Sequence, residues 1–185
     1  MQLTTPRLRL RPTTRKDIPD IVANINNLNV SKWLLVVPYP YRKKHAEEWL
    51  ESQKKHTKEK PRKDYTFGIE LRLEHRIIGG MGIHHIDKRQ GTATTGYWLG
   101  EDYWRQGYGS EAFEAVLNFA FNKLKLRRLE AEVYVGNPAS GKLLEKFGFK
   151  REGMRRKAVK SKADGKIHNA YIYGLLKEEY KKNGK

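Results

Sequence analysis

The sequence contains no cysteine, which excludes disulfide bonds, thiolate nucleophiles and cysteine metal ligands. It also lacks any apolar run that approaches the roughly 20 residues needed for a membrane-spanning helix. The first residues, Met1 to Pro6, show no basic segment followed by an apolar one, so no secretory signal is expected. These absences favour a cytoplasmic protein that does not cross a membrane.

Acidic residues are also scarce, because 21 aspartates and glutamates stand against 38 lysines and arginines. The formal net charge of +17 attracts polyanions such as a phosphorylated cofactor, RNA, a ribosome or an acidic protein. The alternative is that a lysine-rich surface serves only solubility. Since the 185 residues are 38% hydrophobic and show no linker or internal repeat, we expect one domain over residues 1–185.

Apolar residues recur with periods that are typical of alternating strands and helices. Strands are expected up to Pro12 and at residues 65–71, 77–83, 92–99, 128–135 and 167–176. Helices are expected at residues 15–28, 43–56, 107–125 and between Pro138 and Gly148, with a helical tail over 177–185. The strand at 92–99, the long helix and the strand at 128–135 form a strand–helix–strand unit, which predicts that the two strands are parallel.

Two glycines, Gly107 and Gly109, directly precede the long helix. The first N–H groups of a helix lack intrahelical acceptors, and the helix dipole adds positive charge there. Glycine lets a ligand approach the backbone closely, so this stretch suits a phosphate or pyrophosphate, to which Arg105 adds charge. Alternatively, the glycines only form a turn and Ser110 only caps the helix. Neither the Walker A loop nor the three-glycine dinucleotide fingerprint fits the spacing.

Several short motifs surround these glycines. Gly96-Tyr97-Trp98-Leu99 and Tyr103-Trp104 precede them, Glu111-Ala112 follows them, and Asn137-Pro138-Ala139-Ser140 and Glu145-Lys146-Phe147-Gly148-Phe149 lie further on. The set resembles the GNAT acetyltransferase superfamily over essentially the whole chain. Within it, the set is similar to the ribosomal-protein N-terminal-alanine acetyltransferase (Rim-type) group. The resemblance implies an α/β (α+β) fold of the GNAT type. This fold has a mixed central sheet of about six to seven strands, helices on both faces, and a splayed parallel strand pair that holds acetyl-CoA.

The resemblance also implies which residues hold acetyl-CoA. Backbone N–H groups of residues 105–110 would bind the pyrophosphate, and the strand at Trp98 and Leu99 would offer its backbone to the pantetheine arm. Asn137 and Ser140 would contact the pantetheine or the thioester. The expected cofactor-binding residues are therefore Trp98, Leu99, Arg105, Gln106, Gly107, Tyr108, Gly109, Ser110, Asn137 and Ser140.

The proton-transfer residues of the superfamily are only partly present. Many GNAT enzymes protonate the leaving thiolate with a tyrosine seven residues after the motif asparagine, but that position here is Leu144. In the Rim-type group a serine at the position of Ser140 is assigned to the leaving thiolate, which makes Ser140 the catalytic candidate. Two glutamates that serve as bases in parts of the superfamily are absent, because their positions fall near Thr94 and Val159.

His84, His85, Glu101 and Tyr134 remain as candidates for a general base, and each can equally be structural. Of these, we keep Glu101 and His84 beside Ser140 as catalytic candidates. A well-positioned α-amine needs no dedicated base, since its pKa is only about 7.8. No metal site is expected, because the adjacent His84 and His85 lack a third spaced ligand.

We therefore expect an acetyl-CoA-dependent N-acetyltransferase that releases coenzyme A and acts on a protein N-terminal α-amine of the ribosomal-protein type. A small amine, such as a polyamine or an antibiotic, is the alternative acceptor. The net charge would repel a polycationic acceptor unless the cleft were locally acidic. An inactive GNAT scaffold that binds a ribosome or RNA is the alternative outside the enzymes.

The same resemblance implies that the first two helices and their connection form part of the acceptor cleft. Trp33, Tyr39 and Tyr41 are therefore either residues of the cleft wall or ordinary core aromatics. Contacts with a ribosome or an acidic protein are expected, contacts with a membrane are not, and the chain is a monomer or a homodimer.

Overall fold

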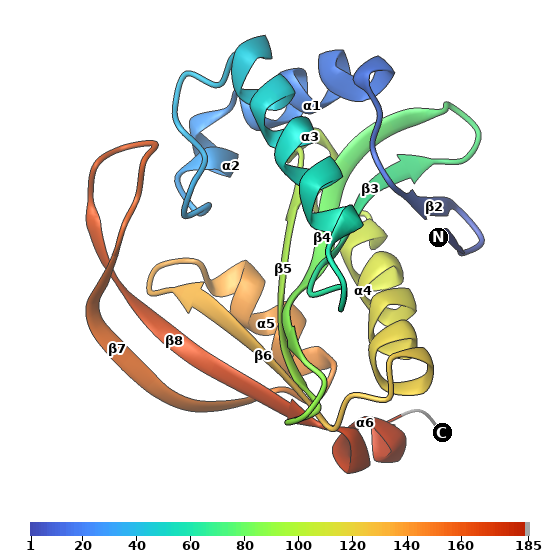
Figure 1. Cartoon of the computed structure of the whole chain (residues 1–185). Coiled ribbons are helices and arrows are strands. Elements are labelled where there is room, and N and C mark those ends of the chain that lie inside the picture. Colours follow the sequence, from blue (N-terminus) through green and yellow to red (C-terminus); the bar gives the residue numbers. More distant parts are fainter. Residues whose placement is uncertain (184–185) are drawn as a thin grey trace.

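A mixed sheet of eight strands forms the centre of the computed structural model, which describes residues 1–183 (Figure 1). In chain order the strands are β1 (Leu3–Thr4), β2 (Leu8–Arg11), β3 (Tyr65–Leu71), β4 (Arg76–Asp87), β5 (Thr92–Leu99), β6 (Arg128–Tyr134), β7 (Lys150–Lys160) and β8 (Ile167–Leu176). Their order across the sheet is β1-β2-β3-β4-β5-β6-β8-β7. The sheet exceeds the expected six to seven strands. Two strands were not expected. One is β1, which has only two residues, and the other is β7, which runs through a basic segment without an alternating pattern.

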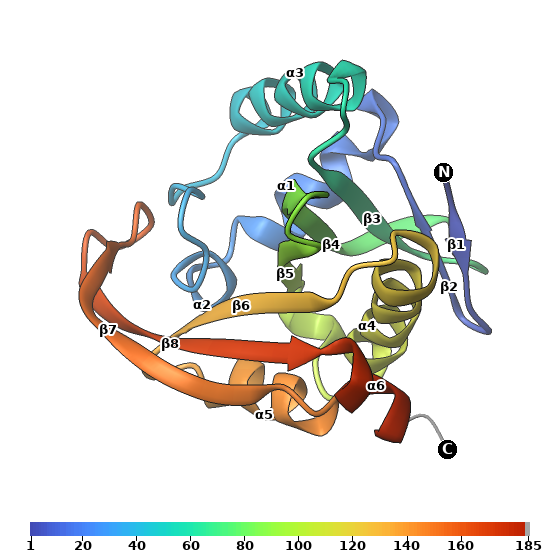
Figure 2. The same cartoon turned by 60° about the horizontal axis from the view of Figure 1, so that its bottom comes forward.

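Helices cover both faces of the sheet (Figures 1 and 2). They are α1 (Ile18–Ile25), α2 (Leu28–Ser31), α3 (Lys43–Lys58), α4 (Tyr108–Asn118), α5 (Pro138–Lys146) and α6 (Lys177–Asn183). Ile77 and Ile78 are neighbours on β4 and point to opposite faces. Ile77 packs with α1 and α3, whereas Ile78 belongs to the large core that α4 and α5 share. None of the described helices is long and apolar enough to cross a membrane.

Two helices differ from the sequence-based prediction. The helix expected at 15–28 is divided, because Asn26 ends α1 and the Asn27 side chain accepts a hydrogen bond from the Asn29 N–H at 2.8 Å to begin α2. The helix expected at 107–125 is regular only to Asn118, and a π-helical turn covers Phe119–Lys123. The helical tail forms α6, and residues 184–185 of that prediction lie outside the described residues.

Helix α4 is fixed to the sheet by its apolar face. Ala112, Phe113, Val116 and Leu117 recur at helical spacing and are fully buried. The Phe113 ring lies 5.3 Å from the ring of Tyr97 on β5 and 5.3 Å from that of Phe147, just after α5. This one side chain therefore sets the spacing between β5, α4 and α5.

The parallel strands β5 and β6 touch only at one end. Their register has three pairs, which begin at Thr92 and Arg128 and end at Thr94 and Glu130. Beyond these pairs β5 remains bonded to β4, while β6 is bonded to β8 along its whole length. A gap therefore opens between the carboxyl-terminal halves of β5 and β6, as the splayed pair of the resemblance implied.

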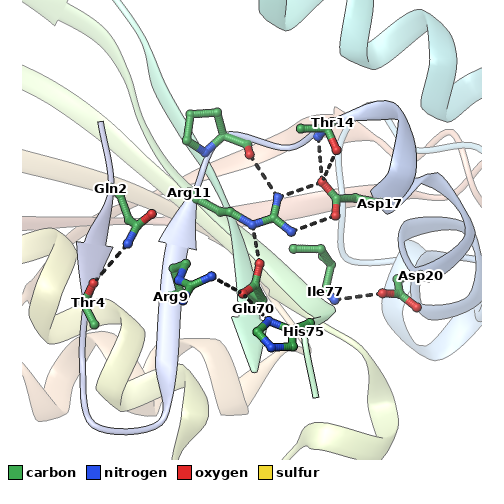
Figure 3. A network of polar contacts seen from close by, with 11 residues as sticks. Gln2, Thr4, Arg9, Arg11, Thr14, Asp17, Asp20, Glu70, His75 and Ile77 are labelled. Carbon is green, nitrogen blue, oxygen red and sulfur yellow. Dashed lines mark hydrogen bonds and ion pairs between the residues drawn. The ribbon is translucent and has the colours of Figure 1, made fainter. Parts of the chain in front are cut away.

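An ion network ties the amino-terminal strand to α1 outside this gap (Figure 3). Arg9 and Arg11 on β2 both pair with the buried carboxylate of Glu70 on β3. Arg11 also donates two 2.8 Å hydrogen bonds to Asp17, which accepts a third from the Thr14 N–H at 2.6 Å. Burial of Asp17 acts to raise its pKa. The hydrogen bonds from Arg11 and Thr14 outweigh that effect and hold the pKa below its usual value.

Candidate functional site

The glycine loop has the geometry of an anion site. Gly107 adopts a left-handed conformation with φ of 82° and immediately precedes α4. The first helical bond runs from the Glu111 N–H to the Gly107 carbonyl at 3.0 Å, so the N–H groups of residues 108–110 have no intrahelical acceptor. Residues 104–107 are exposed and residues 108–110 are partly exposed, so a ligand can approach this end of the helix.

Arg7 holds this loop from the amino-terminal segment, and sequence reasoning missed it. Its guanidinium donates to the Gln106 carbonyl at 3.0 Å and to the Glu111 carboxylate at 2.6 Å. It also lies 4.4 Å above the Tyr108 ring. Arg7 is one of several arginines in the segment before Pro12, and nothing in its spacing distinguishes it, so only the fold identifies its partner.

The remaining loop residues are fixed by short contacts. Gln106 donates from its side chain to the Asp102 carbonyl at 2.6 Å, while Arg105 has a positive φ of 58° and an exposed side chain. A Cβ on Gly109 would lie 3.3 Å from Leu99, so this glycine brings α4 close to the end of β5. Lys146 of α5 donates to the Ser110 hydroxyl at 3.1 Å and adds a positive charge beside the helix N-terminus.

Strand β5 forms one wall of the gap, and the N–H and C=O groups of every second residue of this strand point into the gap. The Gly100 N–H donates to the Ile78 carbonyl at 2.9 Å, and backbone direction alternates along a strand. The backbone of Trp98 therefore faces β4, while the backbones of Tyr97 and Leu99 face the gap. Of the two residues expected to offer backbone to the pantetheine arm, Leu99 is placed to do so and Trp98 is not. The Leu99 carbonyl accepts from the Trp104 indole at 2.9 Å, which leaves its N–H for a ligand.

The second motif forms the amino-terminal end of α5. Asn137 caps this helix, and its side chain accepts a hydrogen bond from the Ser140 N–H at 3.3 Å. The Ser140 hydroxyl lies 2.8 Å from the hydroxyl of Tyr97, which reaches it from β5. Sequence reasoning found Ser140 but not Tyr97, since the two residues are 43 positions apart. The predicted serine therefore lies at the gap, next to the wall that Leu99 forms.

The two base candidates, Glu101 and His84, have hydrogen-bond partners other than Ser140. Glu101 follows β5, and both its carboxylate oxygens accept hydrogen bonds from the side chains of Asn27 and Asn29, at 2.5 and 3.0 Å. His84 pairs with Thr94 across β4 and β5, at the closed end of the gap and about 10 Å along β5 from Tyr97. Burial lowers the pKa of His84, although Asp64 at 3.1 Å opposes this effect.

The remaining base candidates are His85 and Tyr134, and the buried hydroxyl of Tyr134 has no hydrogen-bond partner among the described residues. His85 is exposed and lies 3.1 Å from the Thr94 hydroxyl. The ring of Tyr134 stacks on His168 with 5.1 Å between centroids, and burial raises the pKa of Tyr134 to about 12. Among the described residues, no group of three histidine or carboxylate side chains could hold a metal ion.

The aromatic residues expected on the acceptor side occupy three different environments. Tyr41 is buried among α1 and α3 and is a core residue, whereas Tyr39 is exposed. Trp33 reaches across to the turn that leads into α5, where a Cβ on Gly136 would lie 3.5 Å from its ring. Trp33 is therefore the one of the three that contacts the candidate site.

Comparison with known proteins gives a consistent result. The family model of the acetyltransferase (GNAT) domain matches residues 7–150. The chain is 30% identical to the uncharacterized N-acetyltransferase YoaA of Bacillus subtilis over 95% of its length and 96% of that protein. It is 38% identical to the uncharacterized N-acetyltransferase p20 of Bacillus licheniformis, but this match spans only 62% of the chain and 63% of that relative.

A solved structure has the same fold throughout. It is a proposed ribosomal-protein-serine acetyltransferase from Vibrio cholerae, with a TM-score of 0.79 and 26% identity. The similarity covers 95% of this chain and 97% of that one.

Proposed function

This chain belongs to the GNAT acetyltransferase family, and from that premise we propose that it acetylates a protein N-terminal α-amine with acetyl-CoA. The observation that carries the proposal is the gap between β5 and β6. It opens after the Thr94–Glu130 pair and leads towards Ser140 and the N-terminus of α4. The preferred acceptor is a ribosomal protein, which would place the enzyme in the cytoplasm.

The residues around the gap fit acetyl-CoA. The free N–H groups of residues 108–110, with Lys146 and Arg105 nearby, suit the pyrophosphate. The gap-facing backbone of Leu99 suits the amides of an extended pantetheine arm. When bound, acetyl-CoA supplies an acetyl group activated as a thioester. The part of this chain is then to hold that group beside Ser140.

The acceptor amine has an open route to the gap. Gly96 on β5 is exposed, and a Cβ there would meet no atom within 4 Å. Alternate residues of a strand point to opposite faces, so this opening lies on the face opposite the side chain of Tyr97. An amine arriving from there reaches the gap without displacing the Tyr97–Ser140 contact.

Proton removal from the amine requires no dedicated side chain in this proposal. Glu101 is occupied by Asn27 and Asn29, and His84 lies at the closed end of the gap. An α-amine with a pKa of about 7.8 is neutral in roughly a quarter of its molecules near pH 7.4, so the nucleophilic form is available without a dedicated base and solvent can take the remaining proton. Ser140 is the group placed to donate a hydrogen bond to the leaving sulfur.

A protein acceptor is favoured over a small polycation for two reasons. The similar structure from Vibrio cholerae is described as a proposed ribosomal-protein-serine acetyltransferase. In addition, β7 is an exposed edge strand rich in lysine and arginine, which suits an acceptor that is presented beside RNA. An inactive scaffold that only binds RNA would need the same surface, so turnover has to be measured.

The test is thiol release from acetyl-CoA in the presence of peptides with N-terminal serine or alanine, and of polyamines and aminoglycosides. Because the chain has no cysteine, the protein adds no thiol background. Thiol release with a peptide, and a mass gain of one acetyl group at its α-amine, is the expected result. Release with small amines alone would support the alternative acceptor. RNA binding without any release would support the inactive scaffold.

A further inference from the structure

Tyr97 holds the hydroxyl of Ser140 at the mouth of the gap. The Tyr97 hydroxyl lies 2.8 Å from Ser140 Oγ and donates to the Ser140 backbone oxygen at 3.0 Å. We propose that Tyr97 is the positioning residue for Ser140, which frees the serine hydrogen to point into the gap when negative charge develops there. This inference rests on the proposed function and adds the residue through which Ser140 acts.

The hydrogens of the two hydroxyl groups can be arranged in two ways. The two hydroxyls have one hydrogen each, and the acceptors are Ser140 O, Ser140 Oγ and Tyr97 Oη. While Tyr97 donates to Ser140 O, the serine can donate to Tyr97 Oη, and both hydrogens are used within the pair. When Tyr97 donates to Ser140 Oγ instead, the serine hydrogen is free. The two arrangements differ only by rotation of hydroxyl groups, and no heavy atom has to move.

The second arrangement matches the charge that acetyl transfer creates. As the amine nitrogen bonds to the thioester carbonyl carbon, the carbon–sulfur bond breaks and its electron pair moves to sulfur. Ser140 then donates a hydrogen bond to that sulfur, and Tyr97 donates one to Ser140 Oγ. Neither hydroxyl loses its proton. The proton of the amine passes to solvent, and solvent later protonates the thiolate.

Tyr97 is suited to this part because it remains a neutral donor in a fixed place. Burial raises the pKa of its hydroxyl to about 12, against the opposing effect of the Ser140 hydrogen bond. Its ring is held at 5.3 Å from the fully buried Phe113. The hydroxyl can therefore turn, while the ring that carries it cannot easily leave Ser140.

The Tyr97–Ser140 contact could also serve only to hold α5 in place. A second tyrosine that holds α5 provides a control for this possibility. Tyr173 on β8 donates its hydroxyl to Glu145 of α5 at 3.1 Å. Tyr173 is buried and Tyr97 is partly buried, and both contact α5, but the partner of Tyr173 is Glu145 and not Ser140. Tyr173→Phe therefore removes an equivalent anchor of α5 and leaves the Tyr97–Ser140 pair in place.

The first experiment compares kcat with KM for acetyl-CoA, using a peptide with N-terminal serine. Tyr97→Phe should lower kcat about tenfold, with KM for acetyl-CoA changed less than about twofold, because one hydrogen bond is lost after binding. Ser140→Ala should have a similar effect, and the double variant should be no slower than Ser140→Ala. Tyr173→Phe should keep kcat within about twofold of the unchanged protein.

The inference is overturned if Tyr97→Phe and Tyr173→Phe lower kcat equally. Losses from Tyr97→Phe and Ser140→Ala that multiply in the double variant would also overturn it. Absence of thiol release from the unchanged protein with every amine tested would instead overturn the proposed function, and this inference with it.

A second readout does not depend on turnover. Tyrosine labelled with carbon-13 at Cζ reports the hydrogen bonding of each hydroxyl by NMR, and Tyr97→Phe and Tyr173→Phe assign the two signals. The Tyr97 signal should move in Ser140→Ala and on addition of coenzyme A, while the Tyr173 signal should keep its position. A Tyr97 signal that is the same with and without the Ser140 hydroxyl would contradict the proposal.

Discussion

Gly107 is the residue on which the candidate pyrophosphate loop most depends. Its φ of 82° is in a region that side chains with a Cβ rarely adopt. A Cβ there would also lie 3.2 Å from the Arg7 guanidinium, which supports the loop. A side chain at this position would therefore disturb the loop conformation and the approach of a phosphate together.

Gly107→Val is expected to weaken acetyl-CoA binding at least about tenfold, since a β-branched residue in this conformation costs about 1–2 kcal/mol before any steric effect on the ligand. Isothermal titration calorimetry measures the affinity. Gly153→Ala is the control, because a Cβ on Gly153 would meet no atom within 4 Å. An affinity for Gly107→Val that equals that of the control would refute the loop assignment.

Asp17 is a buried residue whose ionisation contributes to stability. Its pKa is lowered in the folded protein, so the stabilisation is present above the pKa of the unfolded chain and is lost as pH falls through the folded pKa. Asp17→Asn should lower the free energy of unfolding by about 2 kcal/mol at neutral pH. Urea titrations should show this difference shrinking below about pH 4. Glu51→Gln, which breaks exposed pairs with Lys54 and Arg15, serves as the control and should change little.

At the scale of elements, the segment between α2 and α3 packs on the turn into α5. Trp33 contacts Gly136, whose φ is 104°, and its ring lies 6.2 Å from that of His168 on β8. The first helices of the chain are thereby connected to the turn that begins the Asn137–Ser140 motif. A movement of this segment would therefore shift the turn before Asn137 and, through it, the position of Ser140.

Trp33→Ala should cost about 2 kcal/mol of stability, because a large, partly buried ring is removed. It should also raise KM for a peptide acceptor more than KM for acetyl-CoA, if the segment forms part of the proposed acceptor cleft. Steady-state kinetics with each substrate varied in turn separates the two constants. Tyr39→Ala alters an exposed ring of the same segment and should leave stability unchanged. Equal changes in both constants for Trp33→Ala would count against an acceptor wall at this residue.

The elements also show what the sequence could and could not predict. Periodicity predicted β5 and β6, and local chemistry predicted Asn137 as the cap of α5, because these signals lie within a few residues. The sequence did not predict the division of the first helix. The apolar residues keep their helical spacing from α1 into α2, although Asn26 and Asn27 break the helix between them. Contacts between distant residues carry no local signal, so the Arg7 support and the Tyr97–Ser140 pair appear only in the fold.

For the molecule as a whole, the excess of positive charge has a clear location in β7. The basic residues on this strand are Lys150, Arg151, Arg155, Arg156, Lys157 and Lys160, and all of their side chains are exposed. The turn after it adds Lys162 and Lys166. In the part of the chain that the structure describes, no acidic side chain pairs with Arg156, Lys160 or Lys162. These three cations are available to a polyanion.

Changing Arg156, Lys160 and Lys162 to glutamine should weaken binding to double-stranded RNA. The slope of log affinity against log salt should also fall by about two to three, because each lost phosphate contact removes about 0.7–0.9. Fluorescence anisotropy at several salt concentrations measures both quantities. The same change at Lys44, Lys55 and Lys58 of α3, which lies apart from β7 in both views, is the control (Figures 1 and 2). Equal losses in the two triple variants would show that only the net charge matters.

β7 is an edge strand, and this position bears on aggregation. The sheet ends in the two-residue β1 on one side and in the eleven-residue β7 on the other, so β7 is the edge at which a second copy could add a strand. Two features oppose such growth of the sheet. The register of β7 is broken twice, between Arg151 and Gly153 and between Arg155 and Val159, and its cations would repel those of another copy. The breaks in register and the cations of β7 therefore act against aggregation through the longer free edge of the sheet.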